Sequence, residues 1–239
     1  MKTKPAEILR EYGPFPGVTD VHGVSYDGSH IWIAVGDKLH ALDPASGDVV
    51  RTIDVIARAG TAFDGKHLYQ LADSIIQKID PASGRVLATV PAPEGGGNSG
   101  MTWAEGMLWI ARYKDRKIHQ VDPATGAVLR TIASDRYVTG VTWVDGNLWH
   151  GTWEDDASEL RRVDPASGEV LERLAMPPGA YVSGLESDGG DVLYCGGASS
   201  GRVRAVRRPG SYSPLRAHQA GRTQGSRPLA DKKEDVPST

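Results

Sequence analysis

Short apolar runs, bounded by turn residues, recur along most of the chain. In the first copy they read GVSY, HIWIAV, KLHALD and DVVRTI, and they are separated by Asp27-Gly28, a short turn and Pro-Ala-Ser-Gly. Runs of this length that are rich in β-branched and aromatic residues are typical of strands, and Asp-Gly and Pro-x-x-Gly connections favour hairpins. No helical period competes with the pattern. The sequence therefore predicts an all-β chain built from hairpins.

The pattern repeats as a unit of about 40 residues. Four copies of one phrase are ALDPASGDVVRTI, KIDPASGRVLATV, QVDPATGAVLRTI and RVDPASGEVLERL. The glycines that open the copies are spaced by 37, 40, 40 and 44 residues, and they are Gly23, Gly60, Gly100, Gly140 and Gly184. This period suits a propeller blade of four strands. We therefore predict a single five-bladed β-propeller whose blades start near residues 22, 59, 99, 139 and 183.

The fifth copy loses the pattern before its fourth strand, and the start of the chain supplies a matching segment. AEILREY, residues 6–12, resembles GEVLERL of the fourth copy. We expect this N-terminal strand to complete the last blade and close the ring, because closure removes the exposed edges of an open array. The propeller then occupies residues 1–209, and the polar residues 210–239 are expected to form a disordered tail.

Composition narrows the possible partners. The chain has 239 residues, a formal net charge of −3 and one cysteine, Cys195. The charge gives no reason to expect nucleic acid or a membrane surface as a partner, and a single cysteine excludes an intramolecular disulfide. No apolar run reaches the length of a signal peptide core or the roughly 18 residues of a membrane span. We expect a cytoplasmic monomer whose partner is a small-molecule ligand or substrate.

Residues that recur in every blade are assigned to the scaffold. One aromatic position is shared by the second strand of all five copies: Trp32, Tyr69, Trp109, Trp149 and Tyr194. These rings are expected to pack between blades. The aspartates of the Asp-Pro pairs resemble a row of calcium ligands, but each is expected to cap its own turn instead.

Residues that differ between blades are the candidates for function, because a specific ligand is recognised by asymmetry on a repeated frame. The loops that enter the innermost strands form one mouth of the central channel. His22, Arg58 and Tyr137 are the expected catalytic residues at this mouth. The expected substrate-binding residues are Asn98, Ser99, Thr139, Trp153, Tyr181 and Ser183. Such a set suits an anionic or carbonyl-bearing molecule, with Arg58 binding the anion and His22 moving a proton.

Each of these assignments has an alternative. His22 can be a space-filling residue, the mouth can be a hydrated channel without a ligand, and Trp153 can cover a loop rather than stack on a ligand. No cofactor is expected, since the phosphate-binding, nucleophile-elbow and metalloprotease motifs are absent. A divalent-metal site at His22 and a loop carboxylate such as Asp20 has no motif to support it, so no metal ligand is assigned.

Two segments resemble the five-bladed glutaminyl-peptide cyclotransferases of the plant and bacterial type. WVDGNLWHGTWEDDASELRRVDPASGEVL is similar to the fourth blade of that family, including Trp153, and KHLYQLAD is similar to its second blade. The Asp-Pro phrase also occurs in YncE-like and streptogramin-lyase-like propellers. The family carries acidic residues directly before several opening glycines, where this chain has His22, Ala59 and Thr139.

The resemblance implies a fold and a pocket position, and His22 is the one residue at those positions able to act as acid and base. The sequence thus predicts a divergent cyclotransferase-like or lyase-like enzyme. The alternative is a non-enzymatic ligand-binding or protein-interaction scaffold that uses the same face, with Trp153 and the acidic residues after it as contacts.

Overall fold

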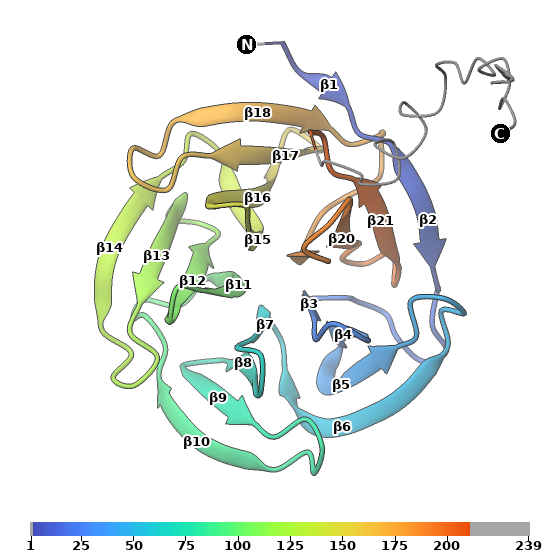
Figure 1. Cartoon of the computed structure of the whole chain (residues 1–239), viewed down its shortest axis with the longest axis vertical. Coiled ribbons are helices and arrows are strands. Elements are labelled where there is room, and N and C mark those ends of the chain that lie inside the picture. The colour runs from blue at the N-terminus through green and yellow to red at the C-terminus, as the bar shows by residue number, and fades with distance from the viewer. Residues whose placement is uncertain (1, 211–239) are drawn as a thin grey trace, which may run out of the picture.

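The computed structural model describes residues 2–210 and shows a ring of five antiparallel sheets around a central axis (Figure 1). The predicted five-bladed β-propeller is confirmed. Residues 2–210 contain no helix, and hence no helix that is long and apolar enough to span a membrane. The expected disordered tail lies outside the described residues, apart from Gly210.

Each blade runs from an innermost to an outermost strand. Blade 1 consists of β3 (Gly23–Tyr26), β4 (Ile31–Ala34), β5 (Gly36–Leu42) and β6 (Val49–Ala57). Blade 2 consists of β7 (Thr61–Phe63), β8 (Leu68–Ala72), β9 (Ile75–Ile79) and β10 (Val86–Pro91). Blade 3 consists of β11 (Asn98–Ala104), β12 (Met107–Arg112), β13 (Lys117–Val121) and β14 (Val128–Ala133). Blade 4 contains β15 (Tyr137–Val144), β16 (Asn147–Glu154), β17 (Ala157–Val163) and β18 (Val170–Ala175). Blade 5 contains β19 (Leu185–Ser187), β20 (Val192–Gly196) and β21 (Val203–Arg207).

The N-terminal segment closes the ring, as predicted. β2 (Ile8–Tyr12) pairs antiparallel with β21, with Tyr12 opposite Val203, and so becomes the outermost strand of blade 5. The sequence did not predict β1 (Lys4–Pro5), which pairs in parallel with β18 and adds a fifth strand to blade 4. The N-terminal segment therefore joins blades 4 and 5, which lie side by side in Figure 1.

Five hydrophobic clusters hold the ring together, and each lies between two adjacent blades. The repeated second-strand aromatics are buried in these clusters, as expected. Tyr69 of blade 2 stacks on Trp103 of blade 3 with 5.3 Å between ring centroids. Trp109 stacks in the same way on Trp143 of blade 4, at 5.8 Å. Because each ring reaches across to the next blade, the aromatic repeat stabilises the ring rather than a single blade.

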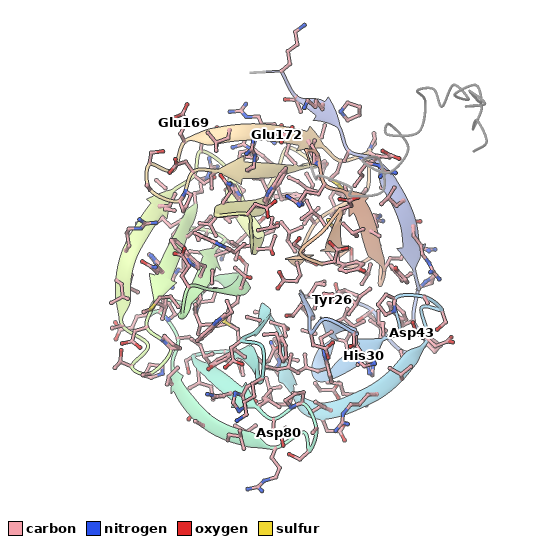
Figure 2. The ribbon with its side chains drawn as sticks, in the orientation of Figure 1. Tyr26, His30, Asp43, Asp80, Glu169 and Glu172 are labelled. Carbon is pink, nitrogen blue, oxygen red and sulfur yellow. The ribbon has the colours of Figure 1, made fainter. Side chains whose placement is uncertain are left out.

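The Asp-Pro aspartates cap their own turns. The backbone N–H of Ala45 donates to Asp43 Oδ1 at 2.7 Å, and the N–H of Ala82 donates to Asp80 Oδ1 at 3.0 Å. The same bond recurs in the other two copies. Figure 2 shows Asp43 and Asp80 well apart at the periphery of the ring. The turn-capping interpretation therefore holds, and the aspartates do not converge on a shared ion.

The opening glycines form a second ring, directly around the central axis. A Cβ added at Gly140 would lie 2.3 Å from the backbone N of Leu185, and one added at Gly184 would lie 2.6 Å from the N of Val24. The other three opening glycines face the backbone of the next blade in the same way. The innermost strands approach this closely because no side chain separates them. This glycine ring narrows the channel below the mouth loops.

Candidate functional site

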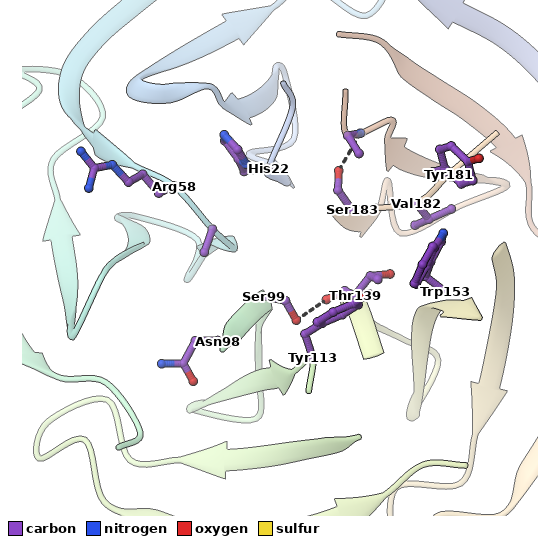
Figure 3. A pocket seen from close by; sticks show the side chains of 12 residues that line it. His22, Arg58, Asn98, Ser99, Tyr113, Thr139, Trp153, Tyr181, Val182 and Ser183 are labelled. Atoms are coloured by element: carbon purple, nitrogen blue, oxygen red, sulfur yellow. Dashed lines mark hydrogen bonds between the residues drawn. The ribbon is translucent and has the colours of Figure 1, made fainter. Parts of the chain in front are cut away.

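A pocket of about 340 Å³ lies at the mouth of the channel, above the glycine ring (Figure 3). We call it the mouth pocket. Its lining comes from all five blades: His22, Arg58, Ala59, Asn98, Ser99, Tyr113, Thr139, Trp153, Tyr181, Val182, Ser183 and Ala198. Of the nine residues expected at the mouth, only Tyr137 is missing from this lining. The structure thus gathers the non-repeated residues around one opening.

An aromatic wall forms one side of the mouth pocket. Tyr137 is not among the lining residues, and its expected catalytic role at the mouth stays a prediction. The Tyr137 ring stacks on Tyr113 at 4.9 Å and lies 6.3 Å from Trp153. The guanidinium of Arg116 covers Tyr137 at 4.4 Å from the ring centroid. Tyr137 therefore supports the two lining rings, since its faces are occupied by other side chains.

Tyr113 was missed in the sequence, although the repeat contains a signal for it. It stands four residues after the second-strand aromatic Trp109, and Trp153 stands four residues after Trp149. The equivalent residue of blade 5, Ala198, also lines the mouth pocket. Variation at this one position of the repeat marks the rim of the pocket.

Three of the expected substrate-binding residues already have partners within the fold. Ser99 Oγ donates toward the carbonyl of Val138, at 2.9 Å, and so connects blade 3 to blade 4. Ser183 Oγ donates to the carbonyl of Val21 and connects blade 5 to blade 1. Asn98 accepts from the guanidinium of Arg112 through Oδ1 at 3.3 Å and donates to a loop carbonyl through Nδ2. These side chains form part of the pocket wall, and their hydrogen bonds are made to other groups of the fold.

Thr139 differs from these neighbours. Its Oγ1 is buried and has no hydrogen-bond partner among residues 2–210, while the residue itself is 7% exposed and lines the mouth pocket. An unpaired buried hydroxyl costs free energy, because it has lost its bonds to water. The Thr139 hydroxyl lies against Gly151 and is closed off from the open pocket, so Thr139 lines the pocket without offering a donor to a ligand.

This contrast predicts that two small substitutions change stability by different amounts. Ser99→Ala should lower the free energy of unfolding by about 1–2 kcal/mol, because it removes a bond between blades. Thr139→Val should change it by less than about 1 kcal/mol, because it replaces an unpaired hydroxyl by a methyl group. Urea denaturation of both variants checks the pair. Equal losses would show that the Thr139 hydroxyl has a stabilising partner in solution.

His22 and Arg58 stand at the rim of the mouth pocket on neighbouring blades (Figure 3). The backbone N–H of His22 donates to Ala34, but its imidazole makes no hydrogen bond within the described part of the chain. Arg58 lies 3.3 Å from Asp73, and both side chains are 60% exposed. A pair this exposed is weak, so the guanidinium can turn toward a ligand. No carboxylate lines the pocket.

The structure also reveals a carboxyl group that the sequence analysis overlooked. Glu186 of β19 is buried on the channel axis, one step below the glycine ring. Its Oε1 accepts hydrogen bonds from Thr142 Oγ1 of blade 4 and from the backbone N–H of Ser187, and Ser25 Oγ of blade 1 lies 3.5 Å from Oε2. Burial raises the pKa of Glu186 to about 7. The sequence did contain a signal for Glu186. Two residues after the opening glycine, the other blades carry Ser, Ala or Thr.

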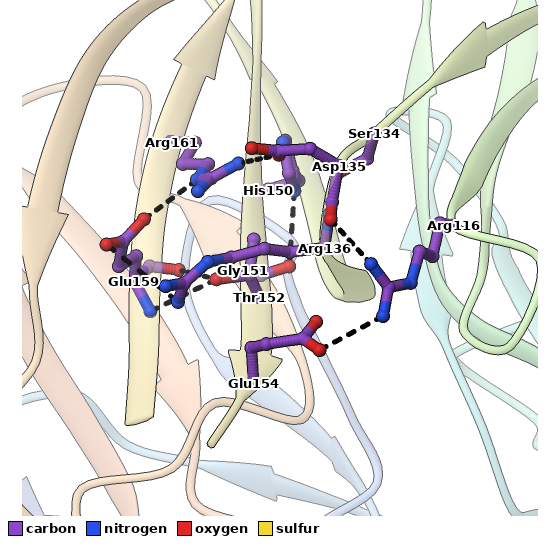
Figure 4. A network of polar contacts seen from close by, with 10 residues as sticks. All are labelled: Arg116, Ser134, Asp135, Arg136, His150, Gly151, Thr152, Glu154, Glu159 and Arg161. Carbon is purple, nitrogen blue, oxygen red and sulfur yellow. Dashed lines mark hydrogen bonds and ion pairs between the residues drawn. The ribbon is translucent and has the colours of Figure 1, made fainter. Parts of the chain in front are cut away.

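A polar network joins blades 3 and 4 behind the aromatic wall (Figure 4). Arg161, which is 1% exposed, pairs with Asp135 and, at 2.8 Å, with Glu159. Arg116 pairs with Glu154 at 3.0 Å. His150 is buried beside this network, and burial lowers its pKa to about 4. Glu154, one of the acidic residues after Trp153, is therefore already neutralised by an arginine.

The geometry offers no ready metal site. No group of three or more His, Cys, Asp or Glu side chains within residues 2–210 is placed to hold a metal ion. Asp20, the carboxylate considered as a partner for His22, is absent from the pocket lining. The chemistry available at the mouth is that of an imidazole, a guanidinium and an aromatic wall.

Fold and site together define a five-bladed propeller with one asymmetric pocket at the channel mouth. The chain belongs to the family whose model is described as outer membrane protein assembly factor BamB, which matches residues 16–136 and 72–227. No curated protein sequence matches the chain.

Solved structures share the architecture. The glutaminyl cyclase of Myxococcus xanthus has a TM-score of 0.71 at 20% identity, covering 86% of this chain and 97% of that one. The Cps50 (Swd1) β-propeller domain of Myceliophteria thermophila has a TM-score of 0.55 at 11% identity, covering 85% and 100%. At these identities the likeness shows the fold alone, a propeller related to that of glutaminyl cyclase.

Proposed function

We propose that the protein binds a small molecule in the mouth pocket and acts on it as a divergent cyclotransferase-like or lyase-like enzyme. The proposal rests mainly on one observation: the unbonded imidazole of His22 lines the same pocket as the guanidinium of Arg58. An imidazole can accept and return a proton near neutral pH, and a guanidinium can donate hydrogen bonds to a developing oxyanion.

The fold shared with a glutaminyl cyclase favours the cyclotransferase form of this proposal. In that reaction the amine of an N-terminal glutamine attacks its own side-chain amide carbon. One C–N bond forms, the amide C–N bond breaks, and ammonia leaves. His22 would take the proton from the attacking amine and return it to the departing nitrogen. Arg58 would bind the carbonyl oxygen. In the lyase form, His22 would remove a proton from carbon so that a neighbouring bond can break.

A second candidate is a ligand-binding scaffold without turnover, and the pocket lining provides its support. No carboxylate lines the pocket with His22, so no acidic side chain of the lining orients the imidazole for proton transfer. The same pocket would then hold a ligand that it does not convert.

His22→Ala distinguishes the two candidates. With glutaminamide and glutaminyl peptides as probes, we expect ammonia release by the unmodified protein and a loss of about 100-fold or more in the variant. The melting temperature should not change, because the imidazole makes no hydrogen bond within residues 2–210. His40→Ala, on the outer part of blade 1, is the matched control.

Other results would count against the enzyme. Probes that raise the melting temperature of the unmodified protein without releasing ammonia would support the scaffold. An unfolded His22→Ala variant would show that His22 has a packing role.

A further inference from the structure

A second cavity adjoins the mouth pocket, and we call it the side groove. Its volume is about 680 Å³, and it shares Arg58, Ala59 and Asn98 with the mouth pocket. Its other walls are the turn at Asp73-Ser74 and the segment 91–97, which leads from β10 to β11. A ligand bound in the mouth pocket can therefore extend into the side groove, along blade 2.

The loop that forms the outer wall contains a run of three glycines. It spans residues 92–97; the equivalent connections after β6 and β14 span residues 58–60 and 134–136, and the one after β18 spans residues 176–184. Three consecutive glycines in it have positive φ angles of 87°, 67° and 72°. The length of the loop lies within the range of the equivalent connections, so the run of glycines is what distinguishes it.

A buried arginine holds this loop in place. Arg112 is 5% exposed, and its Nη1 donates to the carbonyls of Pro93, at 3.0 Å, and Glu94, at 2.6 Å. Its other donors bind Asp115. The remaining blades carry Val, Ala, Thr or Gly at this position of the repeat. Burying a guanidinium costs free energy unless its donors form hydrogen bonds. Here the donors of Arg112 bind the loop and Asp115, so Arg112 fixes the shape of this wall.

The side groove is more acidic than the mouth pocket. It contains the carboxylates of Asp73 and Glu94 and one guanidinium, that of Arg58. Arg58 pairs with Asp73, while Glu94 has no ion pair within residues 2–210. The mouth pocket has no carboxylate in its lining. The far part of the groove is therefore suited to a positive charge.

We propose that the side groove is a subsite for the continuing chain of a short peptide whose first residue occupies the mouth pocket, and that Glu94 selects peptides with a lysine or arginine downstream. This inference rests on the proposed function, because the mouth pocket must bind the first residue. It adds a substrate class and a specificity-determining residue. The fixed loop lowers the entropy cost of binding an extended chain.

Binding measurements with five amidated probes test the proposal: glutaminamide, Gln-Ala-Ala-Ala, and the same tetrapeptide with lysine at its second, third or fourth residue. We expect one lysine peptide to bind about fivefold more tightly than the alanine peptide, the value of an exposed ion pair. Glu94→Gln should abolish that preference and leave glutaminamide binding unchanged. High salt should weaken the preference in the unmodified protein.

Glu105→Gln is the matched control, since Glu105 is an exposed acid beyond the opposite end of β11. It should retain the lysine preference. If glutaminamide binds but the unmodified protein and Glu94→Gln treat all tetrapeptides alike, the side groove proposal is wrong and the proposed function stands. If neither glutaminamide nor any peptide binds, the proposed function fails and the inference fails with it.

Discussion

Gly140→Ala is expected to destabilise the propeller by more than about 3 kcal/mol. The added methyl would lie 2.3 Å from the backbone N of Leu185 and 2.4 Å from the carbonyl carbon of Gly184. Neither atom belongs to a side chain that can rotate away. The whole innermost strand of blade 5 would have to move, and the inter-blade cluster behind it would be disturbed. For a domain of this size the melting temperature should fall by roughly 6–12 °C.

Gly190→Ala provides the comparison within the same chain. Gly190 has an ordinary φ, and its added Cβ would lie 3.4 Å from the side chain of Asp188, an ordinary contact. We expect a change within about 0.5 kcal/mol. Urea and thermal denaturation of both variants measure the difference. Similar stabilities would mean that the ring opens without cost, contrary to the closed geometry.

Glu186→Gln should remove a component of stability that decreases as the pH rises. Burial raises the pKa of Glu186 from 4.5 to about 7 in the folded protein. Between these values the folded state holds a proton that the unfolded state has released, so the free energy of unfolding falls with rising pH. The contribution is complete below pH 4.5 and is lost as the pH passes 7. The shift corresponds to about 3 kcal/mol.

The free energy of unfolding also depends on pH through His150, and this dependence has the opposite sign. The Glu186→Gln variant is needed to separate the two contributions. Burial lowers its pKa from 6.5 to about 4, so the unfolded state binds the extra proton between these values. Stability from His150 is therefore present above pH 6.5 and lost as the pH falls toward 4. In the unmodified protein the two slopes oppose each other between pH 4.5 and 6.5. The Glu186→Gln variant should reveal the rising slope to which His150 contributes together with His40 and His119, whose pKa values burial also lowers.

The test is the difference in unfolding free energy between the unmodified protein and Glu186→Gln, measured by urea denaturation from pH 4.5 to 8. We expect the unmodified protein to lose about 3 kcal/mol relative to the variant across this range. Glu169→Gln, at an exposed acid on the outer rim (Figure 2), should give a constant difference. A constant difference for Glu186→Gln as well would show that this carboxyl keeps its hydration.

Glu186 also bears on the proposed function. It is the acidic group on the channel axis of the described chain, yet the glycine ring separates it from the mouth pocket and its oxygens are bonded to the fold. It therefore does not replace the acidic residues expected before the opening glycines. His22 remains the group proposed to move a proton in the pocket.

The repeat made the fold predictable. Five opening glycines, four Asp-Pro phrases and one aromatic position per blade determined the number of blades, the strand order and the closure by residues 6–12. These features are local or periodic, so the strands assigned in one copy of the repeat can be assigned in the other copies as well. The pairing of β1 with β18 was not predicted, because two residues of strand carry no period.

The site was predictable only as a set of positions. Subtracting the repeat found eight residues that line the mouth pocket, but it could not tell a free group from a bonded one. Ser99 and Ser183 look like ligand-binding hydroxyls in the sequence, and in the structure they connect blades. Thr139 looks the same in the sequence and is unpaired. Their partners lie about 40 or more than 160 residues away, beyond any local pattern.

The sequence by itself determined the architecture, because strand period, turn residues and repeat length act over a few residues at a time. Only the tertiary structure decided which polar groups are available to a ligand and which are used by the fold. It placed Tyr137 behind Tyr113, committed Arg112 to the loop beside the side groove and enclosed Glu186 on the axis. Hydrogen bonding and burial depend on neighbours from other blades, and those neighbours exist only once the ring has closed.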